Sequence, residues 1–209
     1  APPPPSSGSS AESNTFSGGD GDDTIIGSPG NDTLDGLLGD DVIIGLGGDD
    51  VINGNSGNDS LEGGNGDDTL SGNGGADTLN SGNGNDTYIW SGEPDGTDIL
   101  TDAPGFQTLQ VVGDAATDNF TIDQNGSLLR VSEGTGSITT NQNVASVLVN
   151  GGDGDDVITL TGLSGSRALL LSVNGEAGND TINGSSTTLG SIVAFLNGND
   201  GNDLSLIHI

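Results

Sequence analysis

The sequence predicts an all-β fold in which a flattened solenoid of very short strands is followed by a wider parallel β-helix. The first observation is a nine-residue repeat over residues 18–89, where glycine-rich turns alternate with short β-prone segments. The second is the return of similar turns at Gly151, Gly175 and Gly198, spaced 24 and 23 residues apart, each after an aliphatic run. A regular step between such units favours a stack of coils.

The composition by itself favours a disordered chain. The chain has 209 residues, of which 31 are acidic and 2 are basic, and its formal net charge of −29 opposes any compact state. Its 39 glycines raise the entropy lost on ordering, and its few aromatic residues offer little large-area burial. These features are typical of a disordered acidic chain, so the prediction of a fold depends on the periodicity.

The same composition argues against several classes of function. A strongly acidic chain is poorly suited to bind nucleic acid or anionic membranes. The sequence has no cysteine, which excludes disulfides, cysteine-based zinc sites and iron–sulfur clusters. A membrane span needs about 18 consecutive apolar residues, and the sequence contains no such run.

The repeat begins at Gly18 and runs through eight units without a slip of register. Position four is always glycine: Gly21, Gly30, Gly39, Gly48, Gly57, Gly66, Gly75 and Gly84. Position six is always aspartate: Asp23, Asp32, Asp41, Asp50, Asp59, Asp68, Asp77 and Asp86. Position eight is always apolar: Ile25, Leu34, Ile43, Ile52, Leu61, Leu70, Leu79 and Tyr88. A sequence that is merely rich in a few residue types would not keep the same type at three fixed positions of every unit.

These residue types indicate how each unit folds. Glycine suits a tight turn with positive φ, and the segment after it suits a short strand with one inward side chain. Two units then complete one coil, and equivalent turns stack 18 residues apart. The sixth-position aspartates fall on two edges of the solenoid: Asp23, Asp41, Asp59 and Asp77 on one, and Asp32, Asp50, Asp68 and Asp86 on the other.

Stacked carboxylates repel one another unless a cation lies between them. Oxygen ligands without histidine, cysteine or methionine nearby select Ca²⁺ over transition metals, and Mg²⁺ prefers a smaller shell with its own waters. The alternative is that these aspartates are ordinary turn formers that bond their own backbone. The fifth-position acids either join the ion site or only solvate the turn: Asp22, Asp40, Asp49, Asp67 and Asp155.

With these columns, residues 18–89 resemble the RTX family, whose calcium repeat reads G-G-x-G-x-D-x-U-x. The resemblance implies a parallel β-roll in which the sixth-position aspartate and turn carbonyls hold Ca²⁺, with roughly six sites, three on each edge. The metal residues it implies are the eight aspartates named above with Gly21, Gly30, Gly39, Gly48, Gly57, Gly66 and Gly84. Pro29, Leu38 and Ala76 depart from the family pattern and are expected to weaken their sites.

The later turns predict coils of a wider right-handed β-helix. Aliphatic runs at 146–149, 169–173 and 191–196 precede them. The sixth-position aspartates of these turns are expected to stack on one edge and to bind Ca²⁺: Asp156, Asp180 and Asp203. This part resembles the long-coil, calcium-turn repeats that accompany RTX blocks in large bacterial surface proteins.

The sequence divides into five parts: a Pro/Ser-rich linker at 1–15, the β-roll at 16–90, an irregular β connector at 91–145, the long-coil solenoid at 146–203 and a tail at 204–209. Alternation around Asn125-Gly126 predicts a hairpin in the connector. The tail is expected to be non-native, because Ser205 stands where the pattern needs an apolar residue and LSLIHI matches a translated sequencing adapter. We therefore expect a truncated fragment of a larger bacterial secreted protein.

We predict that the chain is not an enzyme. It has one histidine, His208 in the tail, and neither cysteine nor lysine, so no nucleophile–base pair can be assembled. A sugar-stacking role for Tyr88 and Trp90 is the weaker alternative to core packing.

The predicted function is calcium binding by extracellular RTX repeats, with Ca²⁺-driven folding after type I secretion of a bacterial secreted or cell-surface protein. The alternatives are a spacer or adhesion module of a surface adhesin, or the non-catalytic C-terminal part of a secreted hydrolase or toxin. The predicted partners are calcium ions and other domains of the parent chain, and the sequence does not specify a surface or glycan partner.

Overall fold

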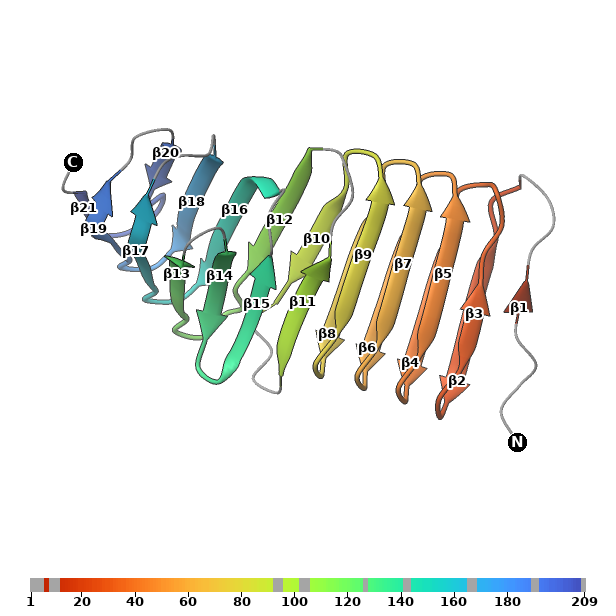
Figure 1. The fold of residues 1–209 in the computed structure, drawn as a ribbon. Helices are drawn as coiled ribbons and strands as arrows, with labels where there is room; N and C mark the ends of the chain where they lie inside the picture. The colour runs from red at the N-terminus through yellow and green to blue at the C-terminus, as the bar shows by residue number, and fades with distance from the viewer. Residues whose placement is uncertain are drawn as a thin grey trace.

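The fold of the protein, taken from a computed structural model, is a two-sheet solenoid whose strands stack from one end of the chain to the other (Figure 1). The structure describes residues 6–7, 12–91, 96–101, 106–125, 128–140, 144–164, 169–188 and 192–207. Every regular element among them is a β-strand, which confirms the predicted all-β solenoid. Most of the predicted linker and the end of the predicted tail, including His208, lie outside the described residues.

One sheet has twelve strands and the other has nine. In spatial order the twelve-stranded sheet contains β1 (Ser6–Ser7), β3 (Thr24–Ile26), β5 (Val42–Gly47), β7 (Ser60–Asn65), β9 (Thr78–Asn83), β11 (Thr97–Thr101), β15 (Gly136–Thr140), β14 (Leu128–Glu133), β13 (Asn119–Asn125), β17 (Val157–Ser164), β19 (Thr181–Thr188) and β21 (Leu204–Ile207). The nine-stranded sheet contains β2 (Thr15–Asp20), β4 (Thr33–Leu38), β6 (Val51–Ser56), β8 (Thr69–Gly74), β10 (Thr87–Trp90), β12 (Gln107–Val112), β16 (Val144–Asp153), β18 (Leu169–Ala177) and β20 (Ile192–Asn197).

The chain alternates between the two sheets, so its turns lie along two edges. Turns that lead into the twelve-stranded sheet form the first edge, and turns that lead into the nine-stranded sheet form the second edge. In the nonapeptide block neighbouring strands pair parallel, with Ile25 opposite Ile43 and Leu34 opposite Ile52. Two nonapeptides therefore make one coil, as the period predicted.

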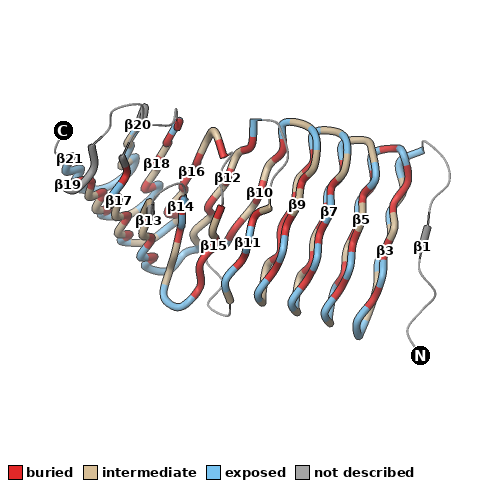
Figure 2. Tube along the Cα trace, in the orientation of Figure 1, coloured by how far each residue is buried: buried red, intermediate tan, exposed pale blue. Residues whose placement is uncertain are grey.

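The eighth-position side chains fill the space between the sheets. All eight are at most 1% exposed, since alternate residues of a strand point to opposite faces. Figure 2 shows this alternation of buried and exposed positions along the strands. The chain can bury its core with one apolar side chain per strand because the coil is so narrow.

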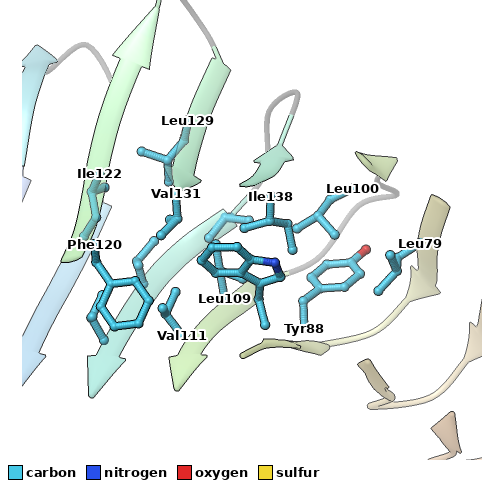
Figure 3. Packing of buried hydrophobic residues seen from close by; sticks show 14 of the residues in the cluster. Leu79, Tyr88, Leu100, Leu109, Val111, Phe120, Ile122, Leu129, Val131 and Ile138 are labelled. Carbon is cyan, nitrogen blue, oxygen red and sulfur yellow. The ribbon is translucent and has the colours of Figure 1, made fainter. Parts of the chain in front are cut away.

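Aromatic residues enlarge the core where the nonapeptide block ends. Figure 3 shows Tyr88 and Phe120 among aliphatic residues from both sheets, including Leu109 and Val131. Trp90 is 3% exposed and meets Phe120 edge to face, with ring centroids 6.3 Å apart. Tyr88 and Trp90 are therefore core residues and do not form an exposed platform for a sugar.

The coils lengthen beyond this point. The sequence step between equivalent turns rises from 18 residues to 21, then to 38, and settles at 24 and 23. The longest coil contains β13, β14 and β15, which pair antiparallel in order, with Ile122 opposite Val131 and Val131 opposite Ile138. The nine-stranded sheet has no counterpart of these antiparallel strands, because β12 pairs directly with β16.

The segment expected to be an irregular connector thus contributes strands to both sheets. Leu100 and Leu109 are buried like the eighth-position residues before them. In the long coils, β16, β18 and β20 continue one sheet and β17, β19 and β21 the other. Ser205 lies opposite the buried Ile182, at the inward position that the pattern assigns to an apolar residue. None of the described segments is a helix with the length and apolarity that crossing a membrane requires.

Candidate metal centre

The sixth-position aspartates form hydrogen-bonded ladders along both edges. From the third unit onward, each uses Oδ1 to accept the backbone N–H of the equivalent aspartate one coil earlier, and Asp32 Oδ1 accepts that of Asn14. Asp50 Oδ1 accepts the N–H of Asp32 at 2.7 Å, and Asp59 Oδ1 accepts the N–H of Asp41 at 2.8 Å. The same bond, at 2.7–2.9 Å, is made by Asp41, Asp68, Asp77 and Asp86. One carboxylate oxygen thus joins adjacent coils.

The second carboxylate oxygen, Oδ2, has no hydrogen-bond partner in most of these turns, although it is buried. This holds for Asp23, Asp41, Asp50, Asp59, Asp68, Asp77, Asp86, Asp156 and Asp180 among the described residues. A buried polar atom without a partner costs about 1–3 kcal/mol, and a charged one costs more. Rows of such atoms require a positive charge to compensate them.

The pKa values of these aspartates also indicate that the carboxylates need a compensating charge. Burial, opposed by the backbone hydrogen bond and reinforced by neighbouring carboxylates, raises the pKa of Asp50 and Asp59 to about 6. The same causes raise the pKa of Asp68 and Asp77 to about 7. The ionised form is therefore unfavourable here without a cation, and a bound cation keeps such carboxylates deprotonated.

The first-position glycines leave open the space beside Oδ2 in the turns that have them; in the Asp86 turn this position is occupied by Ser81. A Cβ on Gly36 would overlap both Asp41 Oδ2 and the carbonyl oxygen of Gly54 in the next coil. A Cβ on Gly45 would likewise overlap Asp50 Oδ2 and the carbonyl oxygen of Gly63. A carboxylate oxygen and a backbone carbonyl therefore border one small space in both of these turns, and a side chain at position one would fill it.

Backbone conformation at position two helps to shape these turns. Leu37 and Leu46 have φ of 83°, and Asn55 and Asn73 have φ of 72° and 65°. Leucine rarely adopts this left-handed region. These four turns therefore hold the left-handed conformation without a glycine at position two, whereas Ser28, at position two of the Asp32 turn, does not adopt it.

The donor set fits a hard cation. Within the described part of the chain, no three side chains of His, Cys, Asp or Glu come together as a metal-binding group. The ligands of an ion in these turns would then be backbone carbonyl oxygens with one or two carboxylate oxygens, a set that suits Ca²⁺.

Two turns differ because Oδ2 of their aspartate accepts hydrogen bonds from the protein itself. Ser28 donates its backbone N–H to Asp32 Oδ2 at 2.6 Å, and Ser28 Oγ lies 2.9 Å from the same oxygen. In the long coils, Asp118 Oδ2 accepts the backbone N–H of Asp114 at 2.9 Å. The Asp32 turn contains Pro29, one of the predicted departures, whereas Asp41 and Asp77, in the turns with Leu38 and Ala76, keep the unpartnered Oδ2.

The fifth-position side chains also bridge coils, in the opposite direction. Asp22 Oδ1 accepts the backbone N–H of Asp40 at 3.0 Å, and Asp49 Oδ1 accepts that of Asp67 at 2.9 Å. Asp155 Oδ1 accepts the N–H of Asn179 at 2.8 Å. These acids are exposed, and they do more than solvate the turn.

In the long coils the ladder continues along the first edge. Asp156 Oδ1 accepts the N–H of Asp118 at 2.9 Å, Asp180 Oδ1 that of Asp156 at 3.0 Å, and Asp203 Oδ1 that of Asp180 at 3.1 Å. Asp156 and Asp180 are buried, whereas Asp203 is exposed. The three predicted aspartates therefore stack in order on one edge.

Three residues at the sixth position did not emerge from the sequence pattern: Asp98, Gln107 and Asp118. Asp98 Oδ1 accepts the N–H of Asp77 at 2.9 Å, and Gln107 Oε1 accepts that of Asp86 at 3.0 Å. Asp98 and Gln107 fall outside the nine-residue register because their coil is 21 residues long. The signal that identifies Asp118 is GDAATDNF, which keeps glycine, aspartate and an apolar residue at positions one, six and eight.

Comparison with known proteins agrees with this geometry. The family model of the RTX calcium-binding nonapeptide repeat matches residues 10–43, 17–52, 26–61, 53–88, 148–162 and 172–186. Together these segments span more than half of the chain and include both the short and the long coils. No curated protein matches the sequence.

Proposed function

The chain belongs to the RTX calcium-binding nonapeptide repeat family, and from this we propose that Ca²⁺ drives the folding of its solenoid outside the cell. The family's function is that of a structural repeat module that binds several calcium ions. Our proposal goes further and concerns when the module folds and which residues hold the ions.

The observation that carries the proposal is the row of buried Oδ2 atoms without a partner. A chain with a net charge of −29, whose nonapeptide block buries one apolar side chain per strand, has little else to hold those carboxylates in place. An ion that neutralises them and joins adjacent turns contributes its binding free energy to folding. Without the ion, the same carboxylates oppose the folded state.

We assign the ions to the turns whose aspartate has an unpartnered Oδ2. In the nonapeptide block these are Asp23, Asp41, Asp59 and Asp77 on the first edge and Asp50, Asp68 and Asp86 on the second. In the long coils they are Asp156 and Asp180. Asp32 is satisfied by Ser28 and Asp203 is exposed, so neither is proposed as a strong ligand.

An extracellular setting follows from the affinity expected of such turns. Extracellular calcium modules bind with dissociation constants of about 10⁻⁴–10⁻³ M. A site of that strength stays empty at cytosolic calcium and fills outside the cell, so the chain would cross a type I secretion channel unfolded. We propose a secreted or surface protein of a bacterium, as in other proteins with such repeats.

The test is far-UV circular dichroism of the chain, titrated with CaCl₂ from EDTA to about 10 mM, with MgCl₂ as the control. A cooperative transition from coil to β-structure with calcium and not magnesium is expected. A β-spectrum that EDTA does not change would overturn calcium-driven folding, and the aspartates would then be ordinary turn formers.

A second candidate is a spacer or adhesion module of a surface protein. It is favoured by a cluster of buried residues that, within the described part of the chain, extends from Ile25 to Ile182 through short and long coils. A continuous core of this kind suits a stiff rod. Small-angle X-ray scattering in calcium would support a spacer by a single extended particle, and a bent or two-body particle would count against it.

A further inference from the structure

The turns of this solenoid have two backbone conformations. In the first, which we call open, the residues at positions two and four both have positive φ. Among the described residues, every turn whose aspartate keeps an unpartnered Oδ2 is open. The position-two residues of these turns are Gly19, Leu37, Leu46, Asn55, Gly64, Asn73, Gly82, Gly152 and Glu176, and the position-four residues are Gly21, Gly39, Gly48, Gly57, Gly66, Gly75, Gly84, Gly154 and Gly178.

The turns of Asp32 and Asp118 have the other conformation, which we call closed. Both turns lie entirely within the described residues, and φ is not positive at their positions two and four: Ser28, Gly30, Asp114 and Ala116. The N–H of Ser28 donates to Asp32 Oδ2 at 2.6 Å. In the same way the N–H of Asp114 donates to Asp118 Oδ2 at 2.9 Å. This donor satisfies the oxygen that open turns leave unpartnered, and it would repel a cation placed beside that oxygen.

The N–H of position four also changes its partner. In open turns it donates to a carbonyl of the next coil, as Gly39 does to Ser56 at 2.8 Å. In the closed turns it is directed to the position-two side chain of its own turn. Ala116 donates its N–H to Asp114 Oδ1 at 2.6 Å, and the Gly30 N–H lies 3.5 Å from Ser28 Oγ. The closed conformation is thus held by hydrogen bonds within the turn.

The closed turns retain the other parts of the candidate site. Both have glycine at position one and aspartate at position six. A Cβ on Gly27 would overlap Asp32 Oδ2 and the carbonyl oxygen of Gly45, and a Cβ on Gly113 would overlap the equivalent pair of atoms in its own turn. The closed turns therefore differ from the open ones in backbone conformation and not in the carboxylate.

Each closed turn contains one residue that disfavours the open conformation. Pro29 stands at position three of the Asp32 turn, and the residue before a proline is pushed toward extended backbone, which keeps Ser28 out of the left-handed region. Ala116 stands at position four of the Asp118 turn, where the open turns have glycine, and a side chain makes positive φ costly. A short polar side chain at position two is not sufficient to close a turn, because Asn55 and Asn73 are left-handed.

We infer that Pro29 and Ala116 keep the turns of Asp32 and Asp118 closed to calcium, so that backbone conformation at positions two and four selects which turns take an ion. The inference rests on the proposed calcium sites and specifies what distinguishes them from turns with the same carboxylate. Pro29 and Ala116 are positioning residues that act through the backbone and are not calcium ligands.

The test is the number of calcium ions bound per chain, counted by native mass spectrometry of the full chain at saturating calcium. Ser28→Asn combined with Pro29→Ser gives the Asp32 turn the residues of the open Asp59 turn, Asn55 and Ser56, and is expected to bind one ion more than the unchanged chain. Ser28→Asn alone is the matched control, because it keeps the proline, and its count is expected to stay unchanged. Ala116→Gly is expected to add one ion independently, at Asp118.

Circular dichroism in calcium shows which variants are folded, and if the double variant is not, Ala116→Gly decides. A count that stays the same in the folded double variant would overturn the role of Pro29, and so would a count that rises in Ser28→Asn alone. A count that stays the same in Ala116→Gly would overturn the role of Ala116. In each case calcium binding by the open turns would be intact. An unchanged chain that binds no calcium at all would overturn the proposed function itself.

Discussion

Ser28 closes the turn of Asp32 with its own polar groups, since its backbone N–H donates to Asp32 Oδ2 at 2.6 Å and its hydroxyl lies 2.9 Å from that oxygen. In the other second-edge turns of the nonapeptide block this oxygen is buried without a partner. A backbone N–H and a hydroxyl thus give Asp32 Oδ2 the partners that the same oxygen lacks in the neighbouring turns. The two kinds of turn should respond differently when the carboxylate is neutralised.

We predict that Asp32→Asn leaves the number of bound calcium ions unchanged, whereas Asp50→Asn lowers it by one. Asparagine keeps Oδ1, so both variants retain the hydrogen bond to the preceding coil. Only Asp50 loses an oxygen that has no partner in the protein. Equilibrium dialysis with atomic absorption measures the count, and equal losses in the two variants would contradict the distinction between the turns.

The first-position glycines should be intolerant of any side chain. Gly54→Ala places a Cβ against Asp59 Oδ2 and the carbonyl of Gly72, both inside the candidate site. We expect a loss of about 1–3 kcal/mol in the free energy of unfolding with calcium present, the usual cost of overpacking. Gly47→Ala is the control, because its Cβ would meet only the Asn65 carbonyl oxygen at 3.6 Å.

Urea unfolding in calcium compares the two variants. Equal stability of Gly54→Ala and Gly47→Ala would mean that the space beside Asp59 is not needed, and the candidate site would lose its support.

The raised pKa values of the buried aspartates predict how stability depends on pH. Without calcium, a carboxyl whose pKa is higher in the folded than in the unfolded state stabilises the fold when it is protonated. Burial raises the pKa of Asp68 and Asp77 to about 7 and of Asp50 and Asp59 to about 6. This contribution is fully present below the unfolded pKa of about 4 and is lost as the pH rises through about 6–7.

In EDTA, β-structure should therefore increase when the pH is lowered from 8 to 5, as measured by circular dichroism. In calcium the direction reverses, because protons compete with the ion for the same oxygens. The calcium midpoint should rise as the pH falls from 8 to 6. A midpoint that does not change over this range would contradict ligation by these carboxylates.

Tyr88 offers a test of the core beside the Asp86 turn, in which Ser81 occupies position one. Its hydroxyl accepts the backbone N–H of Ser81 at 3.0 Å and donates to Ser81 Oγ at 3.0 Å. Tyr88→Phe removes these bonds inside a buried site, which costs about 1–3 kcal/mol. We expect a lower midpoint of urea unfolding in calcium with no change in the number of bound ions. A change in that number would mean that Tyr88 also shapes the Asp86 turn.

Much of the architecture could be predicted from the columns of the nonapeptide block. A glycine-rich turn and one inward apolar residue every nine positions allow only a narrow coil of two units, which is why Ile25 lies opposite Ile43. The nine-residue register lost its predictive value between Trp90 and the turn that begins at Gly151. There a coil of 21 residues and the insertion of β13, β14 and β15 change the step, although Asp98 and Leu100 keep the same roles.

The sequence by itself determined the two-edged stack of aspartates, the inward apolar row and the calcium chemistry of the family, because each depends on residue types at a constant spacing. Only the tertiary structure decided which of those aspartates keep a buried oxygen without a hydrogen-bond partner. That depends on partners outside the column: Ser28 supplies them for Asp32 Oδ2, and Asp86 Oδ2 has none. Coils pack against neighbours at least 18 residues away, so a periodic sequence specifies the stack, while the local partner of each carboxylate is specified by contacts between coils.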